Sequence, residues 1–420
     1  MPVAVKDNYN TVDMPTTAGN LLLKDVKPAV ESTVTRKLRE AGAIILMKTN
    51  MHEFAMSGTT VSSLGGQTKN PYDLTRTPGG SSGGTGAAVA SNFAAAGFGT
   101  DGVNSIRSPA SANSLVGFRP TKGLVSHAGV MSASTTQEVA GPITRSVDDA
   151  AIILDVIAGY DAADAPTARS VGNIPKSFTA SLDPKGLSGV RVGVLKNFMG
   201  SEPIHEEVNT AMANALKAFK RAGATIVEID DPFFDANVFN RDYDVTKWEF
   251  KTLFNDYLQT LGDKAPVKNL SEVIASGKYH KPSLEKFLTA TDALEMPAQE
   301  TEYLARLSKI DGLRDHLLAR MAQQKIDVVV YPEQKRLVVP VTELNQADRT
   351  GILAAMTGFP AVTVPMGFSK PSSTAPIGVP IGMDILGRPF TEALLIKISY
   401  GFEQATKVRK PPQSVPALRQ

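Results

Sequence analysis

Cysteine is absent from all 420 residues of this chain. Its absence excludes disulfides, thiolate nucleophiles, iron–sulfur clusters and cysteine-based zinc sites, and it fits a reducing compartment such as the cytoplasm, where we expect the protein. An excess of charge of one sign is also lacking, because 44 Lys and Arg residues against 42 Asp and Glu residues leave a net charge of +2. This balance argues against nucleic acid as a partner and against a disordered acidic chain.

Long apolar runs are missing as well. No stretch approaches the ~20 apolar residues that a membrane-spanning helix needs, and residues 1–10 lack the basic, apolar and small-residue order of a secretory signal. We therefore expect no membrane association. Because the chain enters a chemical motif within its first ten residues, the sequence leaves open whether the natural protein begins earlier.

Apolar runs alternate with helical periodicity, which indicates an α/β fold. We expect a single large domain spanning residues 1–420, with a twisted mixed β-sheet flanked by helices. Strands are predicted at 2–5, 43–47 (a buried parallel strand), 189–194, 225–229, 327–331, 361–365 and 382–386. Helices are predicted at 31–40, 87–98 (an Ala-rich helix that ends at Gly97 and runs into a strand), 146–158, 206–222 and 391–404. Residues 231–325 lack strand patterns and are predicted to form a helical insertion that shapes the substrate pocket.

A segment rich in Gly, Ser and Thr extends from residue 57 to residue 86 and is predicted to be a long functional loop. Within it, TPGGSSGGTG places glycines around Ser81 and Ser82, so the backbone can adopt positive φ and approach a ligand closely. A flexible surface loop is the plain alternative. A phosphate cradle is a weaker one, because the P-loop ending and the dinucleotide glycine spacing are both missing.

A second segment, GTDGVNSIRSPAS, covers residues 99–111. Asp101 and Arg107 carry opposite charges and are expected to brace the loop. Backbone N–H groups aimed at one spot stabilise a developing oxyanion, and the candidates here belong to Gly102, Val103, Asn104 and Ser105. Taken alone, Ser105 is more often a hydrogen-bonding turn residue than a nucleophile.

A third segment, VAVKDN at residues 3–8, places Lys6 directly after an apolar strand. Burial of a lysine lowers its pKa because it disfavours the charged form, and such a lysine can act as a base near neutral pH. Taken alone, a lysine is usually a solvated surface charge.

In this order, VAVKDN, TPGGSSGG and GTDGVNSIRSPAS resemble the amidase signature hydrolases. Ser81 and Ser105 lie 24 residues apart, as the family pattern expects. The likeness covers most of residues 1–160 and 350–410. Further matching segments are KTNMHEFA at 48–55, NP at 70–71, GFRPTKG at 117–123, AGPITRS at 140–146, GFPA at 358–361 and LGRPF at 386–390.

The resemblance implies the amidase signature fold and a Ser–Ser–Lys triad. Ser105 would be the nucleophile, Ser81 the bridging serine on a cis peptide after Gly80, and Lys6 the base. Neutral Lys6 would take a proton from Ser81 as Ser81 takes one from Ser105, and water would then hydrolyse the acyl-enzyme. No metal or organic cofactor is implied. The family commonly has two glycines where this chain has Val103 and Asn104, which puts the oxyanion donors in question but not the triad.

The implied activity is hydrolysis of the C–N bond of a small linear amide. Aromatic side chains of the helical region would form either an apolar pocket wall or plain core: Phe233, Phe234, Trp248, Phe250, Phe254 and Tyr257. Further candidates for substrate binding are Met56, Ser57, Gly58 and Met131. These residues favour aryl or hydrophobic amides, with esters and carbamates (urethanes) as further substrates.

Two other functional classes stay open. One is an amidotransferase A-type subunit, which passes ammonia from glutamine to a partner-bound substrate and needs partner subunits. The other is a non-catalytic relative, against which the joint retention of Lys6, Ser81 and Ser105 argues. A homodimer is also left open. The five histidines show no hydrolase or metal-ligand spacing, and His52 is the one expected near the site, in a structural role.

Overall fold

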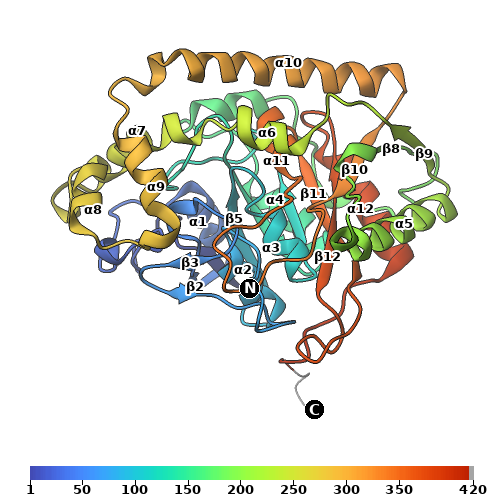
Figure 1. Cartoon of the computed structure of the whole chain (residues 1–420), viewed down its shortest axis with the longest axis horizontal. Coiled ribbons are helices and arrows are strands. Elements are labelled where there is room, and N and C mark those ends of the chain that lie inside the picture. Colours follow the sequence, from blue (N-terminus) through green and yellow to red (C-terminus); the bar gives the residue numbers. More distant parts are fainter. Residues whose placement is uncertain (416–420) are drawn as a thin grey trace.

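A ten-stranded mixed sheet runs through the centre of the molecule (Figure 1). The computed structural model describes residues 1–415. The strands follow the order β2-β1-β5-β7-β6-β11-β12-β10-β8-β9 across the sheet. Their bounds are β1 Pro2–Lys6, β2 Ile44–Thr49, β5 Ala96–Asp101, β6 Val116–Arg119, β7 Val139–Thr144, β8 Arg191–Leu195, β9 Thr225–Ile229, β10 Val328–Pro332, β11 Ala361–Phe368 and β12 Pro380–Leu386. A separate ribbon pairs β3 (Val61–Ser62) with β4 (Gly66–Gln67).

Parallel pairing is confined to the two ends of the sheet. β1 runs parallel to β2 and β5, and β8 runs parallel to β9 and β10. The strands between β5 and β10 pair in antiparallel fashion. The prediction of one domain built on a mixed sheet is therefore confirmed, and β1 lies directly beside β5, which carries the second chemical segment.

Helices cover both faces of the sheet. On β10, Val328 and Val330 belong to a buried cluster with α1, α4, α5 and α12, whereas Val329 and Tyr331 contact a cluster with α6, α10 and α11. This alternation is what a central strand requires, because successive side chains point to opposite faces. The helices are α1 Thr33–Glu40, α2 Gly83–Ala90, α3 Arg107–Ala112, α4 Val147–Ile157, α5 Glu206–Arg221, α6 Ala236–Asp242, α7 Thr246–Leu261, α8 Leu270–Ser276, α9 Lys281–Asp292, α10 Thr301–Gln323, α11 Ile352–Thr357 and α12 Glu392–Thr406.

Residues 231–325 form helices α6 to α10, as their periodicity predicts. In Figure 1, α10 spans the top of the view, and α7, α8 and α9 group at the end nearest β1 and β2. Several of their aromatic side chains build core: the rings of Phe250 and Phe254 lie 5.8 and 5.2 Å from that of Phe54. None of the helices described in residues 1–415 is long and apolar enough to cross a membrane.

Two local predictions need correction. The strand predicted at 43–47 is parallel but not buried, because β2 is the edge of the sheet and leaves Ile44 61% and Leu46 49% exposed. The predicted loop at 57–86 and the helix at 87–98 are both shifted, because α2 begins at Gly83 and ends at Ala90, while Gly97 lies inside β5. Helix α2 packs too closely for larger residues: a Cβ on Gly84 would lie 2.2 Å from the carbonyl oxygen of Asn50.

Candidate active site

Lys6 is the last residue of β1 and is completely buried. Its ammonium nitrogen, Nζ, donates to Ser81 Oγ at 2.7 Å and to Thr100 Oγ1 at 2.8 Å. Burial lowers the pKa of Lys6 to about 8, although the negative charges of Glu138 and Asp101 act in the opposite direction. A substantial fraction of the amine is therefore neutral at mildly alkaline pH.

Ser81 lies two residues before α2 and is completely buried. The Gly80–Ser81 peptide bond is cis, as the resemblance implied. The Ser81 carbonyl accepts a hydrogen bond of 3.0 Å from the His52 N–H group. Gly80 packs against the backbone of Gly58, where a Cβ would approach to 2.8 Å. The strand, the cis peptide and the His52 contact together hold the Ser81 hydroxyl against Lys6.

Ser105 lies in the turn between β5 and α3, and 8% of it is exposed. Its carbonyl accepts a hydrogen bond of 3.3 Å from the Ser82 N–H group. Within residues 1–415, no hydrogen bond joins the Ser105 hydroxyl to Ser81. The structure thus brings Lys6 and Ser81 into direct contact. Ser105 is linked to this pair through the backbone hydrogen bond with Ser82, the residue that follows Ser81.

The backbone around Ser105 leaves four consecutive N–H groups, those of residues 102–105, without an acceptor among residues 1–415. The peptide planes are held by their carbonyl groups, since Gly102 O accepts from Gln137 Nε2 at 3.0 Å and Val103 O from Arg107 Nη2 at 2.7 Å. The side chains of Val103 and Asn104 contact other elements. Val103 packs beside the cluster of α6, α10 and α11, and the Asn104 amide donates to Glu333 at 2.7 Å. Neither side chain therefore accepts a hydrogen bond from the N–H groups of residues 102–105.

A buried network of charges lies beneath the turn. Arg107 Nε contacts Asp101 Oδ2 at 3.0 Å, and Arg107 Nη1 contacts Asp384 Oδ2 at 2.6 Å. Arg119 Nη1 adds a contact of 3.0 Å to Asp101 Oδ1. Although burial acts to raise it, the two arginines hold the pKa of Asp101 below its usual value. The brace expected between Asp101 and Arg107 is present, and it extends to Asp384 on β12.

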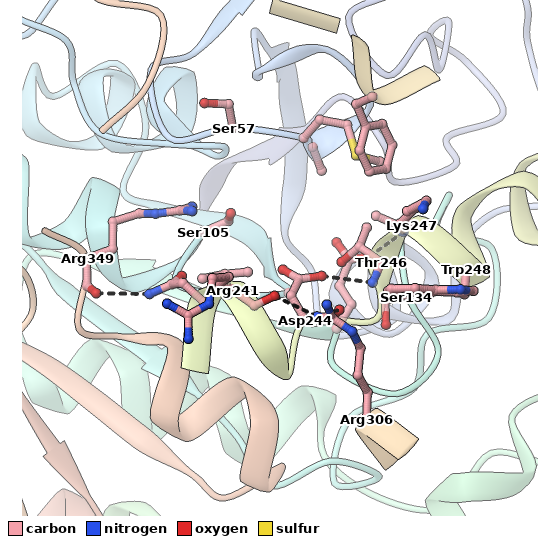
Figure 2. A pocket seen from close by; sticks show the side chains of 18 residues that line it. Ser57, Ser105, Ser134, Arg241, Asp244, Thr246, Lys247, Trp248, Arg306 and Arg349 are labelled. Carbon is pink, nitrogen blue, oxygen red and sulfur yellow. Dashed lines mark hydrogen bonds between the residues drawn. The ribbon is translucent and has the colours of Figure 1, made fainter. Parts of the chain in front are cut away.

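A cavity of about 330 Å³ opens at Ser105 (Figure 2). Met56 and Ser57 contribute to its wall, as predicted. Gly58 and Met131 are not among its lining residues: Gly58 packs against Gly80, and Met131 belongs to the buried cluster around Phe54. The lining residues are Ala55, Met56, Ser57, Gly102, Val103, Ser105, Ala133, Ser134, Glu138, Asn240, Arg241, Asp244, Thr246, Lys247, Trp248, Phe287, Arg306 and Arg349.

Charged side chains, which the sequence-based prediction missed, make up much of this wall. Of the six aromatic residues expected to form either pocket wall or core, only Trp248 lines the cavity. Asp244, Lys247 and Arg306 come from the helical segment 231–325, and Arg349 comes from the loop after β10. No short motif connects these positions, so they could be found only from the folded chain.

The histidine nearest the site has a structural role. His52 is completely buried, its Nδ1 lies 3.3 Å from Thr59 Oγ1, and burial lowers its pKa to about 3. It is therefore neutral and does not line the cavity. Among residues 1–415 there is no group of three or more His, Asp or Glu side chains that could hold a metal ion.

Comparison with known proteins places these segments in a family. The model of a family described as Amidase matches residues 1–396. The chain belongs to the amidase family. The predicted resemblance to the amidase signature enzymes is thereby confirmed, and so is their fold.

Relatives of this chain include amidotransferase subunits and a peptide amidase. The chain is 32% identical to the A subunit of glutamyl-tRNA(Gln) amidotransferase of Thermoanaerobacter pseudethanolicus, over 100% of this chain and 85% of the relative. It is 35% identical to the corresponding protein of Gloeothece citriformis, over 98% and 85%. Among solved structures, the peptide amidase from Stenotrophomonas maltophilia is 34% identical, with a TM-score of 0.86 over 98% of this chain and 84% of that chain. The A subunit of the same amidotransferase from Thermotoga maritima is 28% identical, with a TM-score of 0.79 over 99% and 86%.

Proposed function

We propose that this amidase-family chain cleaves the C–N bond of an amide through an acyl-enzyme on Ser105. The observation that carries the proposal is the buried contact of 2.7 Å between Lys6 Nζ and Ser81 Oγ, next to the cavity that opens at Ser105. A buried lysine paired with a hydroxyl, and not with a carboxylate, is suited to be a base because its neutral form is accessible near pH 8.

In the proposed first step, neutral Lys6 accepts a proton from Ser81 as Ser81 accepts one from Ser105. The Ser105 oxygen then attacks the amide carbonyl carbon. This step requires the Ser105 hydroxyl to approach Ser81, and hydrogen bonds of this kind commonly tighten only in the complex with substrate. The same relay returns the proton to the leaving nitrogen as the C–N bond breaks. Water then attacks the acyl carbon and gives a proton to the relay, the bond between that carbon and the Ser105 oxygen breaks, and the proton returns to Ser105 as the acid is released.

The N–H groups of residues 102–105 are proposed to stabilise the tetrahedral oxyanion. Their lack of acceptors among residues 1–415 supports this role, because a donor that is already paired would have to break a bond first. Each well-placed donor contributes roughly 3 kcal/mol to the transition state. Val103 and Asn104 replace the glycines of the family pattern without blocking this surface, since their side chains contact other elements.

The biological setting of this reaction has two candidates. The curated relatives are the A subunits of amidotransferases, and they favour that setting over an independent hydrolase for hydrophobic amides. The peptide amidase structure favours a hydrolase that works alone. The charges on the cavity wall argue against a preference for purely hydrophobic substrates. Esters and carbamates belong in the substrate panel because they share the acyl carbon that Ser105 would attack.

The test uses the purified chain without added subunits. A fluorophosphonate probe should label the wild type at Ser105 but not Ser105→Ala or Lys6→Ala. Glutamine, a primary peptide amide, an anilide, an ester and a carbamate are then assayed for product. Turnover by the chain alone identifies a hydrolase, whereas ammonia release from glutamine only with added partner subunits identifies a component of an amidotransferase. A folded wild type that is neither labelled nor active under both conditions would contradict the proposal.

A further inference from the structure

One cation on the cavity wall differs from the others. Arg241 pairs with Asp242 at 2.7 Å, and Arg306 pairs with Glu302 at 2.7 Å. The Lys247 ammonium lies 5.1 Å from the centre of the Trp248 ring. The guanidinium of Arg349, in contrast, has neither an ion pair nor a hydrogen bond to any residue in 1–415.

Arg349 comes from the loop after β10 and lines the same cavity as Ser105, and Figure 2 shows its side chain directed toward the part of the view in which Ser105 lies. Its backbone is fixed, because its carbonyl accepts from Asn240 Nδ2 at 3.2 Å and the residue forms a bridge with Gln334. The guanidinium is therefore carried by a main chain that is held on both sides, by Asn240 and by Gln334.

The negative groups near Arg349 are engaged elsewhere. Asp244 accepts the Thr246 N–H group at 2.8 Å, at the start of α7. Glu138 accepts the Ala133 N–H group at 2.5 Å and the Ser132 hydroxyl at 2.8 Å. Glu333 accepts the Asn104 amide at 2.7 Å, and burial and the charge of Asp384 raise its pKa well above its usual range.

An arginine that lines a cavity without a partner has lost part of its hydration without gaining an ion pair. A carboxylate is the group that best compensates for the lost hydration, because the planar guanidinium donates two parallel hydrogen bonds to the two carboxylate oxygens. We propose that Arg349 binds a carboxylate of the substrate, located a few bonds from the scissile carbonyl. The inference rests on the proposed function, because Ser105 defines where that carbonyl lies.

The test compares matched pairs of substrates on the full chain. On the acyl side, the succinyl and glutaryl 4-nitroanilides are compared with the neutral 4-methylpentanoyl and 5-methylhexanoyl analogues of similar shape. On the leaving side, an acetyl amide of 4-aminobenzoate is compared with that of 4-isopropylaniline. We expect wild-type kcat/KM to favour the anionic member of at least one pair by about 10- to 100-fold, the range of a charge-assisted hydrogen bond.

Variants then assign the preference to one residue. In Arg349→Gln the ratio of anionic to neutral kcat/KM should fall about tenfold or more, mainly through KM, and Arg349→Lys should restore part of it. Arg314→Gln removes the same charge from a position that is paired with Asp311 at 2.7 Å and lies outside the cavity, and it should leave the ratio within about twofold of the wild type.

Three outcomes would overturn the inference. The first is a wild type with no preference for either anionic series, which needs no variant and so does not depend on folding. The second is an unchanged ratio in a folded Arg349→Gln. The third is an equal loss of kcat for anionic and neutral substrates, which would instead make Arg349 part of oxyanion stabilisation. The Ser105→Ala variant separates the two proposals. If it loses all turnover while any of these three results is obtained, the proposed function stands and only the role of Arg349 is refuted.

Discussion

Activity should depend steeply on pH if Lys6 is the base. With a pKa of about 8, about 1% of the Lys6 amine is neutral at pH 6 and about 90% at pH 9. We therefore expect kcat/KM for a neutral amide to rise about 90-fold over this interval, close to tenfold per unit below pH 7, and then to level off. An uncharged substrate such as 4-nitroacetanilide isolates the titration of the protein.

The effect of Glu138 on the pKa of Lys6 can be tested by substitution. Its negative charge raises the pKa of Lys6 against the dominant effect of burial. Glu138→Gln removes this charge but keeps an oxygen that can accept the Ala133 N–H group, so the pKa of Lys6 should fall further. The rise in kcat/KM should then occur at lower pH. Glu392→Gln provides the control, because Glu392 is a buried acceptor for the Thr121 N–H group and does not line the cavity.

Three results would refute this reasoning. A profile that stays flat between pH 6 and pH 9 would remove Lys6 from the role of base. A midpoint near 10.5, the ordinary value for lysine, would mean that burial does not tune the amine. A shift of the Glu138→Gln profile to higher pH would show that the interaction between Glu138 and Lys6 has the wrong sign.

The remaining predictions concern stability. Arg107→Met should lower the free energy of unfolding by about 3–5 kcal/mol, because Asp101 and Asp384 would keep buried charges without their main partner. Urea denaturation measures this free energy, and a loss below about 1 kcal/mol would contradict a stabilising role of the network. Gly84→Ala should lower it by about 1–3 kcal/mol through the clash with Asn50. Gly312→Ala, in α10 where a new Cβ meets no atom within 4 Å, should raise it by up to about 1 kcal/mol. Thermal unfolding of Gly84→Ala and Gly312→Ala compares the two positions. The same change in stability in both variants would argue against close packing at α2.

The sequence could predict the contact between Lys6 and Ser81, because each lies in a short segment whose residue order is distinctive. It could also predict the strands with unbroken apolar runs, such as β10 and β11. It missed β6 and β7, since β7 contains Gly141 and Pro142 and becomes a strand only through pairing with β5 and β6. The residues of β7 alone do not indicate which strands it pairs with.

The cavity wall was harder to predict for a different reason. Its charged residues come from segments far apart in the sequence, and their alignment depends on how the helices of 231–325 and the loop after β10 meet at the turn before α3. Phe250 and Phe254 were candidates for the wall because they are aromatic, but Phe54 supplies them with a core to fill. Composition alone cannot distinguish an aromatic residue in the core from one in a pocket.

The position of β1 beside β5 has a consequence for how this protein could change. Lys6 and the residues leading to Ser105 are held by one ladder of main-chain bonds between two neighbouring strands. Arg241, Lys247 and Arg306, three of the charged side chains on the cavity wall, belong to α6, α7 and α10, which take no part in that ladder. New selectivity can therefore be acquired, in evolution or in the laboratory, by exchanging the outer helices while the reacting groups keep their spacing.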